Sequence, residues 1–170
     1  MKTEIVKIKN FGDVKINIEN EVYHCVYLTK TSDGFTIIGQ TNDGLYSRTK
    51  HRLLKKKEFS IIKHHLISNK FLDVKCIFET EDDFTKNVVE QYLIVQQWEN
   101  LIKKYNIENN KNLIVDFYNI SSIRKEKGIK EFVDKMSGNS NLDHKEDLRY
   151  YLAHKEKFPH IKEILSTIKI

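Results

Sequence analysis

The chain has 170 residues, so we expect one ordinary domain, or one domain with a small appendage. Hydrophobic residues make up 39% of the chain and aromatic residues 11%, which is enough for a packed core and excludes global disorder. Lys and Arg number 29 and Asp and Glu number 24, which gives a net charge of +5. This modest basic excess permits a nucleic-acid partner without demanding one.

The number and positions of the cysteines, together with the hydropathy of the chain, indicate the cellular compartment of the protein. The two cysteines, Cys25 and Cys76, lie in separate apolar runs, which excludes a disulfide framework and a CxxC zinc site. The opening residues MKTEIVKIKNFGD contain no apolar stretch of the kind found in a signal peptide, and no run of 18 apolar residues occurs. We therefore expect a protein of the reducing cytoplasm without a membrane partner.

The first part of the chain reads as strands. Four segments are rich in β-forming residues, and several alternate apolar with polar side chains. They are residues 4–9, 13–18, 21–29 and 35–39. Turn-forming residues at 11–13 and 32–34 separate them in pairs, which predicts two β-hairpins.

Helical spacing of apolar residues dominates after Gly39. Predicted helices at 45–57 and 58–68 precede a strand at 71–79 and a long helix at 84–105. The aspartates just before the long helix are placed to cap it. Further on, the sequence predicts a strand at 112–118 and helices at 121–136, at 143–157 and from Pro159 onward.

These elements predict an α/β fold, a small and mostly antiparallel sheet flanked by helices. The asparagine-rich stretch 106–112 is the most plausible internal boundary. The expected divisions are an N-terminal hairpin extension at 1–20, a core at 21–106 and a mainly helical C-terminal region at 107–170.

Several short motifs follow one another inside the expected core. Cys25-Val26-Tyr27 lies on one strand, and Ile37-Ile38-Gly39 lies at the end of the next. Arg48 and His51 come in the following helix, and Glu90 lies in a later one, with Asn106 beyond it. This order and spacing resemble the GIY-YIG nuclease family, over roughly residues 21–106, with CVY in place of GIY and IIG in place of YIG.

The resemblance implies metal-dependent hydrolysis of phosphodiester bonds. Arg48 would stabilise the oxyanion that develops on phosphorus, and Gly39 would let the backbone approach the phosphate. Glu90 would hold one Mg²⁺ or Mn²⁺ ion, which stabilises the leaving oxygen. Tyr27 or His51 would orient or deprotonate the attacking water.

Helical geometry places Glu90 among apolar residues of its predicted helix, away from the polar side. A carboxylate on such a face costs free energy unless it is paired or metal-bound. A buried ion pair is the alternative to a metal site. For Asn106 we favour a structural role at the end of this helix over a role in fixing the Glu90 region.

The chain departs from the family pattern at several positions. Gln40 follows IIG where the family often has lysine, and His51 comes three residues after Arg48 in place of the usual four. Cys25 replaces a glycine, and Ile37 replaces the second tyrosine, which in some members is thought to help activate water. Tyr23 and Tyr46 are further candidates for that task. A nucleic-acid-binding module without catalysis is therefore a second hypothesis. A regulator that binds a partner protein through the C-terminal helices is a third.

Positive charge is concentrated beside the proposed site. Residues 48–70 contain eight Lys or Arg and one acid, Glu58, a local charge of +7, so the rest of the chain sums to −2. We expect this segment to contact the phosphate backbone of DNA, with RNA as the alternative polymer. The predicted contact residues are Lys50, Arg52, Lys55, Lys56, Lys57, Lys63 and His64. Cutting a duplex with one site per chain implies a homodimer or two sequential nicks.

Overall fold

The computed structural model describes residues 2–66, 69–114 and 143–168. It divides into two compact units, Met1–Glu81 and Asp82–Ile170, and each is considered by itself. The predicted helix at 121–136 lies outside the described residues, as does most of the predicted strand at 112–118. The domain division expected from the sequence stays a prediction, since compactness does not test which segments function together.

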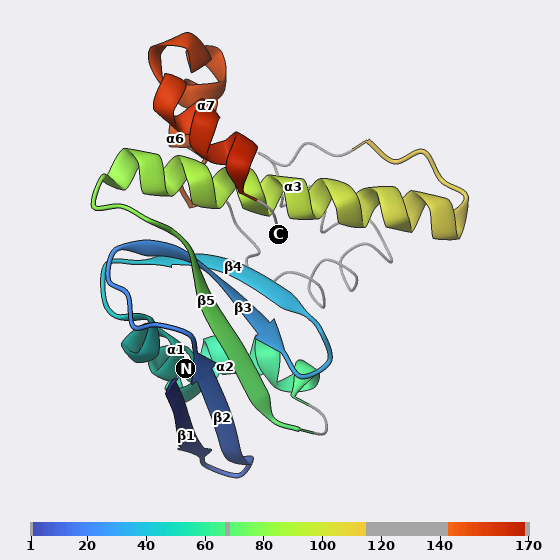
Figure 1. Ribbon diagram of the computed structural model, residues 1–170. Coiled ribbons are helices and arrows are strands. Elements are labelled where there is room, and N and C mark those ends of the chain that lie inside the picture. Colours follow the sequence, from blue (N-terminus) through green and yellow to red (C-terminus); the bar gives the residue numbers. More distant parts are fainter. Residues whose placement is uncertain (1, 67–68, 115–142, 169–170) are drawn as a thin grey trace. The chain divides into compact units, whose positions relative to one another are not determined.

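The first unit is built on a five-stranded sheet (Figure 1). Its strands are β1 (Lys2–Ile8), β2 (Gly12–Ile18), β3 (Cys25–Thr31), β4 (Thr36–Thr41) and β5 (Phe71–Glu79). Their order in the sheet is β1-β2-β5-β3-β4. β2 and β5 pair in parallel, whereas the other three pairs are antiparallel. The predicted α/β class with a mostly antiparallel sheet is confirmed.

Both predicted hairpins are present, and the backbone conformation of their turns explains why the chain reverses there. Asn10 and Gly12 in the first turn and Gly34 in the second have positive φ angles of 62°, 101° and 88°. Glycine and asparagine tolerate this left-handed backbone best, so the chain reverses at these points. β5 then joins the two hairpins, because it pairs with β2 on one side and with β3 on the other.

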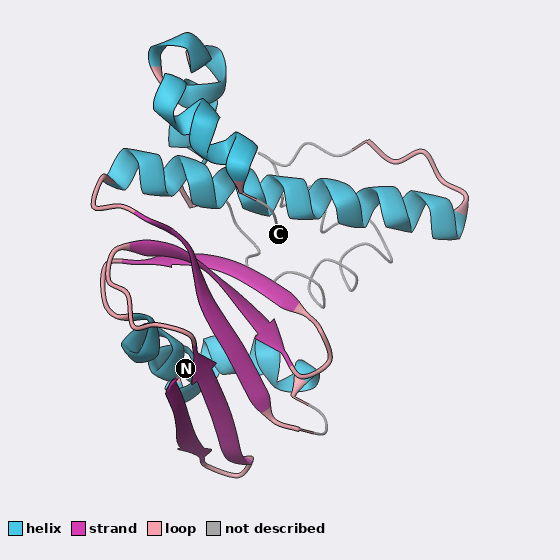
Figure 2. Ribbon diagram, in the orientation of Figure 1, coloured by secondary structure: helices cyan, strands magenta, loops and turns pink. Residues whose placement is uncertain are grey.

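Helices cover one face of this sheet (Figure 2). α1 (Leu45–Leu54) and α2 (Lys56–Ile62) are followed by the 3₁₀ helix η1 (Lys63–His65). The predicted helix 45–57 is interrupted at Lys55, whose backbone is extended with ψ 113°. The apolar side chains buried in this unit come from both layers. They include Val14, Ile16, Ile18, Leu72 and Val74 of the sheet and Leu45, Leu53 and Ile62 of the helices.

The second unit is formed by the long helix α3 (Asp83–Asn109) and two shorter helices, α6 (Lys145–Ala153) and α7 (Pro159–Thr167). The 3₁₀ helix η3 (Lys155–Lys157) links α6 to α7, and Pro159 occupies the first turn of α7 as predicted. Buried side chains join the three helices. They are Val88, Leu148, Tyr151 and Ile161.

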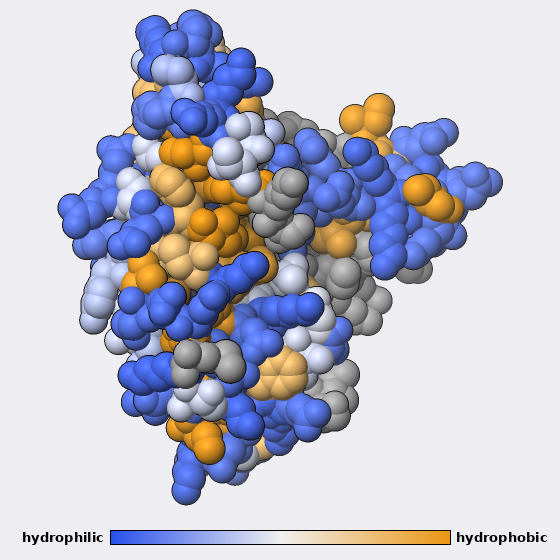
Figure 3. Space-filling view, viewed as in Figure 1, coloured by the Kyte–Doolittle hydropathy of each residue, from blue (hydrophilic) through white to orange (hydrophobic). Residues whose placement is uncertain are grey.

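Most side chains in the view of Figure 3 are hydrophilic, in keeping with a charged fraction of 31%. No helix in the described ranges is long and apolar enough to cross a bilayer.

Candidate functional site

The phenol of Tyr27 lies against the backbone of Gly39. Tyr27 is only 2% exposed and pairs with Gly39 in the register of β3 and β4. A Cβ atom placed on Gly39 would lie 2.6 Å from the Tyr27 hydroxyl oxygen, which is too close for any side chain. The close approach of the ring therefore requires glycine at position 39. The sequence motif alone did not reveal this reason.

Arg48 reaches the same place from helix α1. Its guanidinium lies close enough to Tyr27 for the two side chains to interact. Burial disfavours the charged guanidinium, but Tyr27 and Glu58 favour it, and the pKa of Arg48 is raised above its ordinary value. Arg48 therefore stays positively charged even though its side chain is only 28% exposed.

Arg52 lies one helical turn further along α1 and points the same way. Its guanidinium carbon is 5.9 Å from the centroid of the Tyr27 ring. The Arg52 side chain is only 10% exposed. The structure thus places Arg52 beside Tyr27 and apart from the exposed lysines with which the sequence grouped it.

Glu58 of α2 faces both arginines. Its Oε1 is 3.5 Å from an Nη of Arg48, and its Oε2 is 3.8 Å from Nε of Arg52. We call Tyr27, Gly39, Arg48, Arg52 and Glu58 the Tyr27 cluster. Two guanidinium groups that converge on one point match the oxygens of a carboxylate or a phosphate.

The break at Lys55 explains how Glu58 reaches this cluster. In one continuous helix, residues ten positions apart would be separated by about 15 Å along the axis. The extended backbone of Lys55 ends α1 and lets α2 turn back toward it. Glu58 was not among the residues predicted for the site. It is the single acid beside eight basic residues in 48–70, and this pattern could have indicated that it pairs with some of them.

Exposed basic side chains lie on α1, α2 and η1 around this cluster. Those of the predicted phosphate contacts that are exposed are Lys50, Lys55, Lys56, Lys57, Lys63 and His64. His51 is also exposed on α1. Within the described residues, His51 makes neither a hydrogen bond nor an ion pair with the Tyr27 cluster. The geometry therefore brings Tyr27 together with Arg48, and it leaves His51 outside their contacts.

Glu90 belongs to the second unit, on α3. It is 8% exposed, and its Oε1 accepts a hydrogen bond of 2.8 Å from the Gln91 amide. No group of three or more His, Cys, Asp or Glu side chains suited to a metal occurs among the described residues. A magnesium ion keeps several waters and needs only one or two carboxylates, so a site with Glu90 as the single protein ligand stays a prediction.

Asn106 stabilises the end of the long helix. Its side-chain amide donates to the carbonyl of Leu113 at 3.0 Å and accepts from the Leu113 N–H at 3.1 Å. These paired bonds tie the chain beyond α3 back onto the helix, which is the structural role that we favoured for this residue.

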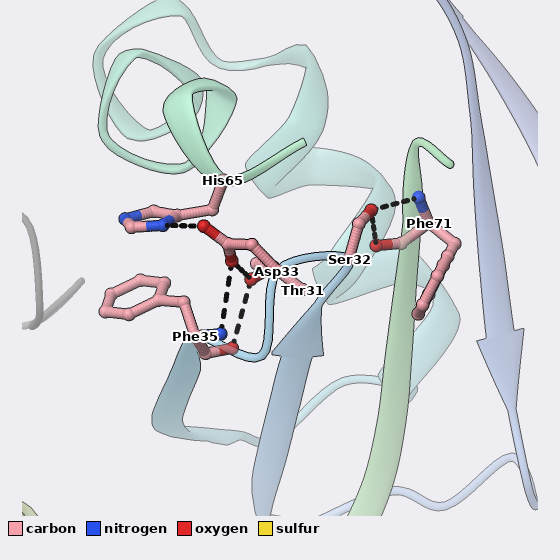
Figure 4. Close-up of polar contacts among 6 residues, drawn as sticks. All are labelled: Thr31, Ser32, Asp33, Phe35, His65 and Phe71. Carbon is pink, nitrogen blue, oxygen red and sulfur yellow. Dashed lines mark hydrogen bonds and ion pairs between the residues drawn. The ribbon is translucent and has the colours of Figure 1, made fainter. Parts of the chain in front are cut away.

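A second polar cluster joins the turn between β3 and β4 to η1 (Figure 4). His65 Nδ1 lies 2.7 Å from Asp33 Oδ2, and its ring stacks on Phe35 at a centroid distance of 3.9 Å. Burial opposes the ionisation of Asp33, but hydrogen bonds from Thr31 and His65 outweigh it, so the pKa of Asp33 is lowered. The adjacent histidines differ in their surroundings, since the structure exposes His64 and buries His65.

Comparison of the chain with protein-family models, with curated proteins and with solved structures found no match. The residues and their geometry are therefore the basis for a functional proposal.

Proposed function

We propose that this chain is a divalent-metal-dependent endonuclease of the GIY-YIG type that hydrolyses phosphodiester bonds in DNA. The observation that carries the proposal is the meeting of Tyr27, Gly39 and Arg48, which come from β3, β4 and α1. These are the positions that the resemblance assigns to the active site.

The Tyr27 cluster supplies what hydrolysis of a phosphodiester requires from the protein. Arg48 would bind a non-bridging oxygen of the phosphate and stabilise the charge that develops as water attacks. The Tyr27 side chain, next to Arg48, would orient that water, and taking up the proton of the water would require Tyr27 in its phenolate form. Its rigid position against Gly39 favours this role, since a buried ring cannot drift from its place.

Glu90 would hold the metal ion, Mg²⁺ or Mn²⁺, in this proposal. When bound, the ion stabilises the negative charge of the leaving oxygen. Glu90 offers a carboxylate, the ligand type that Mg²⁺ prefers, from a buried position on α3. The Gln91 amide supplies one hydrogen bond to it and fixes its orientation.

The exposed lysines of α1 and α2 would neutralise backbone phosphates on either side of the bond that is cut. They carry no sequence information by themselves, since phosphate contacts position a nucleic acid without reading its bases. DNA is the proposed polymer, RNA is the alternative, and cutting both strands would require a homodimer or two successive nicks.

An inactive nucleic-acid-binding module is the second candidate, and two residues favour it. Ile37 and Cys25 are buried at 1% and 0% exposure, and the Ile37 side chain cannot transfer a proton. The position that carries the second tyrosine of the family motif therefore supplies no acid or base here.

Plasmid cleavage separates the two candidates. Purified protein is incubated with supercoiled DNA, and separately with RNA, in Mg²⁺, Mn²⁺ or EDTA. We expect metal-dependent cutting that falls by about 10²-fold or more in Arg48→Ala and in Glu90→Gln. Lys162→Ala, an exposed change on α7, is the matched control and should cut normally. Binding without cutting in either metal would reject the nuclease and favour the binding module.

A further inference from the structure

Glu58 occupies the space between two guanidinium groups, yet it is held there weakly. Both of its ion pairs are longer than a charge-assisted hydrogen bond, at 3.5 Å and 3.8 Å. Its Oε2 atom is buried and accepts no hydrogen bond from the described residues. The carboxylate is therefore attracted by charge without the short, directed bonds that would fix it.

The two arginines have more positive charge and more hydrogen-bond donors than a single carboxylate can satisfy. Arg48 and Arg52 carry two positive charges against the single negative charge of Glu58, so the group retains a net charge of +1. A phosphodiester has two charged non-bridging oxygens, and each can accept a short hydrogen bond from one guanidinium group, whereas Glu58 lies 3.5 Å and 3.8 Å from its partners. A phosphodiester would satisfy this pair of donors better than Glu58 does.

Glu58 is also free to leave. It lies in the first turn of the seven-residue helix α2, next to the helix break at Lys55, and its side chain is 27% exposed. Because both ion pairs are longer than a charge-assisted hydrogen bond, separating them costs less than breaking a short, directed pair would. A swing of the side chain would bring the carboxylate into solvent without moving the backbone.

We infer that Arg48 and Arg52 form a subsite for one phosphate of the substrate, and that Glu58 fills this subsite until the substrate displaces it. The inference rests on the proposed nuclease function and adds two roles to it. Arg52 becomes a residue that binds the phosphate beside the reaction, and Glu58 becomes an internal competitor that lowers affinity for nucleic acid.

The competitor role predicts a gain of binding. Glu58→Gln keeps the size of the side chain and raises the net charge of the arginine pair with its neighbour from +1 to +2. We expect the variant to bind a short DNA duplex about tenfold more tightly than the wild type, measured by fluorescence anisotropy in EDTA so that no cutting occurs. Glu19→Gln makes the same change of total charge at an exposed residue away from α2 and is the matched control.

Opposite results overturn the inference. Were Glu58 a support that holds Arg48 in place, Glu58→Gln would bind more weakly. An effect equal to that of Glu19→Gln would mean that only the total charge matters. Either outcome rejects the competitor, whereas tighter binding by Glu58→Gln without any cutting in Mg²⁺ or Mn²⁺ would reject only the proposed nuclease.

A second measurement tests the subsite directly with inorganic phosphate and requires no DNA. The Nε–Hε signals of the arginines are followed by NMR while inorganic phosphate is added. In the wild type we expect the Arg52 signal to move only at high phosphate concentration, and in Glu58→Gln at about tenfold lower concentration. An Arg52 signal that does not respond to phosphate in either protein would reject the subsite.

Discussion

Gly39 and Tyr27 show how one residue type is dictated by another far along the chain. We expect Gly39→Ala to destabilise the protein by about 1–3 kcal/mol, because the new methyl group meets a buried ring that cannot move aside. Chemical denaturation measures the change. Gly44→Ala is the contrast, since its methyl group also meets an atom at 2.6 Å, but that atom ends the exposed Glu21 side chain, which can rotate away at the cost of one exposed hydrogen bond from the Tyr46 N–H. Equal destabilisation of the two variants would refute this explanation.

The order and spacing of motifs in the sequence placed Tyr27 and Arg48 in one candidate site, and the structure brings these two side chains together, while their catalytic roles stay a prediction. Glu58 could not be placed there from the sequence, since its contact with Arg48 depends on the helix break at Lys55. The same holds for His65, whose adjacent position to His64 conceals that one ring is buried and the other exposed. The type of a residue indicates the chemistry available to its side chain, whereas packing determines which other side chains it contacts.

At the scale of elements, the long helix α3 depends on the residue just before it for a defined start. Asp82 accepts the Thr85 backbone N–H at 2.9 Å, and its pKa is lowered chiefly by the hydrogen bond from the Thr85 side chain. We expect Asp82→Ala to cost about 1 kcal/mol of unfolding free energy. The neighbouring exposed Glu81→Ala should change it far less. A similar small effect of both variants would mean that the cap does not stabilise the helix.

The contact between the β3–β4 turn and η1 should make stability depend on pH. The folded-state pKa of Asp33 lies below its ordinary value of 3.8, so the unfolded chain binds this proton more readily. The contribution of Asp33 is present above about pH 4 and disappears as the pH falls through the lower, folded pKa. We expect Asp33→Asn to be less stable than the wild type at neutral pH, with the difference shrinking at acidic pH. Chemical denaturation from about pH 6 to about pH 2.5 measures this, and a constant difference would contradict it.

Most elements were predictable because their signals are local. The alternation of residues 13–18, the turn residues around Gly34 and the capping aspartate before α3 each act within a few positions. The position of β5 between β2 and β3 was not predictable, since it depends on pairing between strands more than 40 residues apart. The helix break at Lys55 was also missed, because neither Gly nor Pro marks it.

For the whole molecule, the uneven charge predicts the response to salt. If the exposed lysines bind phosphates, removing each one should reduce the slope of log affinity against log salt concentration by about 0.9. We expect the triple variant Lys55→Ala, Lys56→Ala, Lys57→Ala to reduce the slope for DNA by about 2 to 3. The matched triple of Lys155, Lys157 and Lys162 to Ala removes the same charge from the second unit and should leave the slope nearly unchanged. Equal effects would mean that net charge alone governs binding.

Neighbouring residues were sufficient to specify the α/β class, the two hairpins, the capped long helix and the basic segment after Gly39. Three features required the folded chain: Tyr27 presses on Gly39, Arg52 is buried, and Glu58 lies between two arginines. Each of them joins residues from separate elements. The burial and charge pairing that stabilise them exist only once the chain has folded, so no local pattern could reveal them.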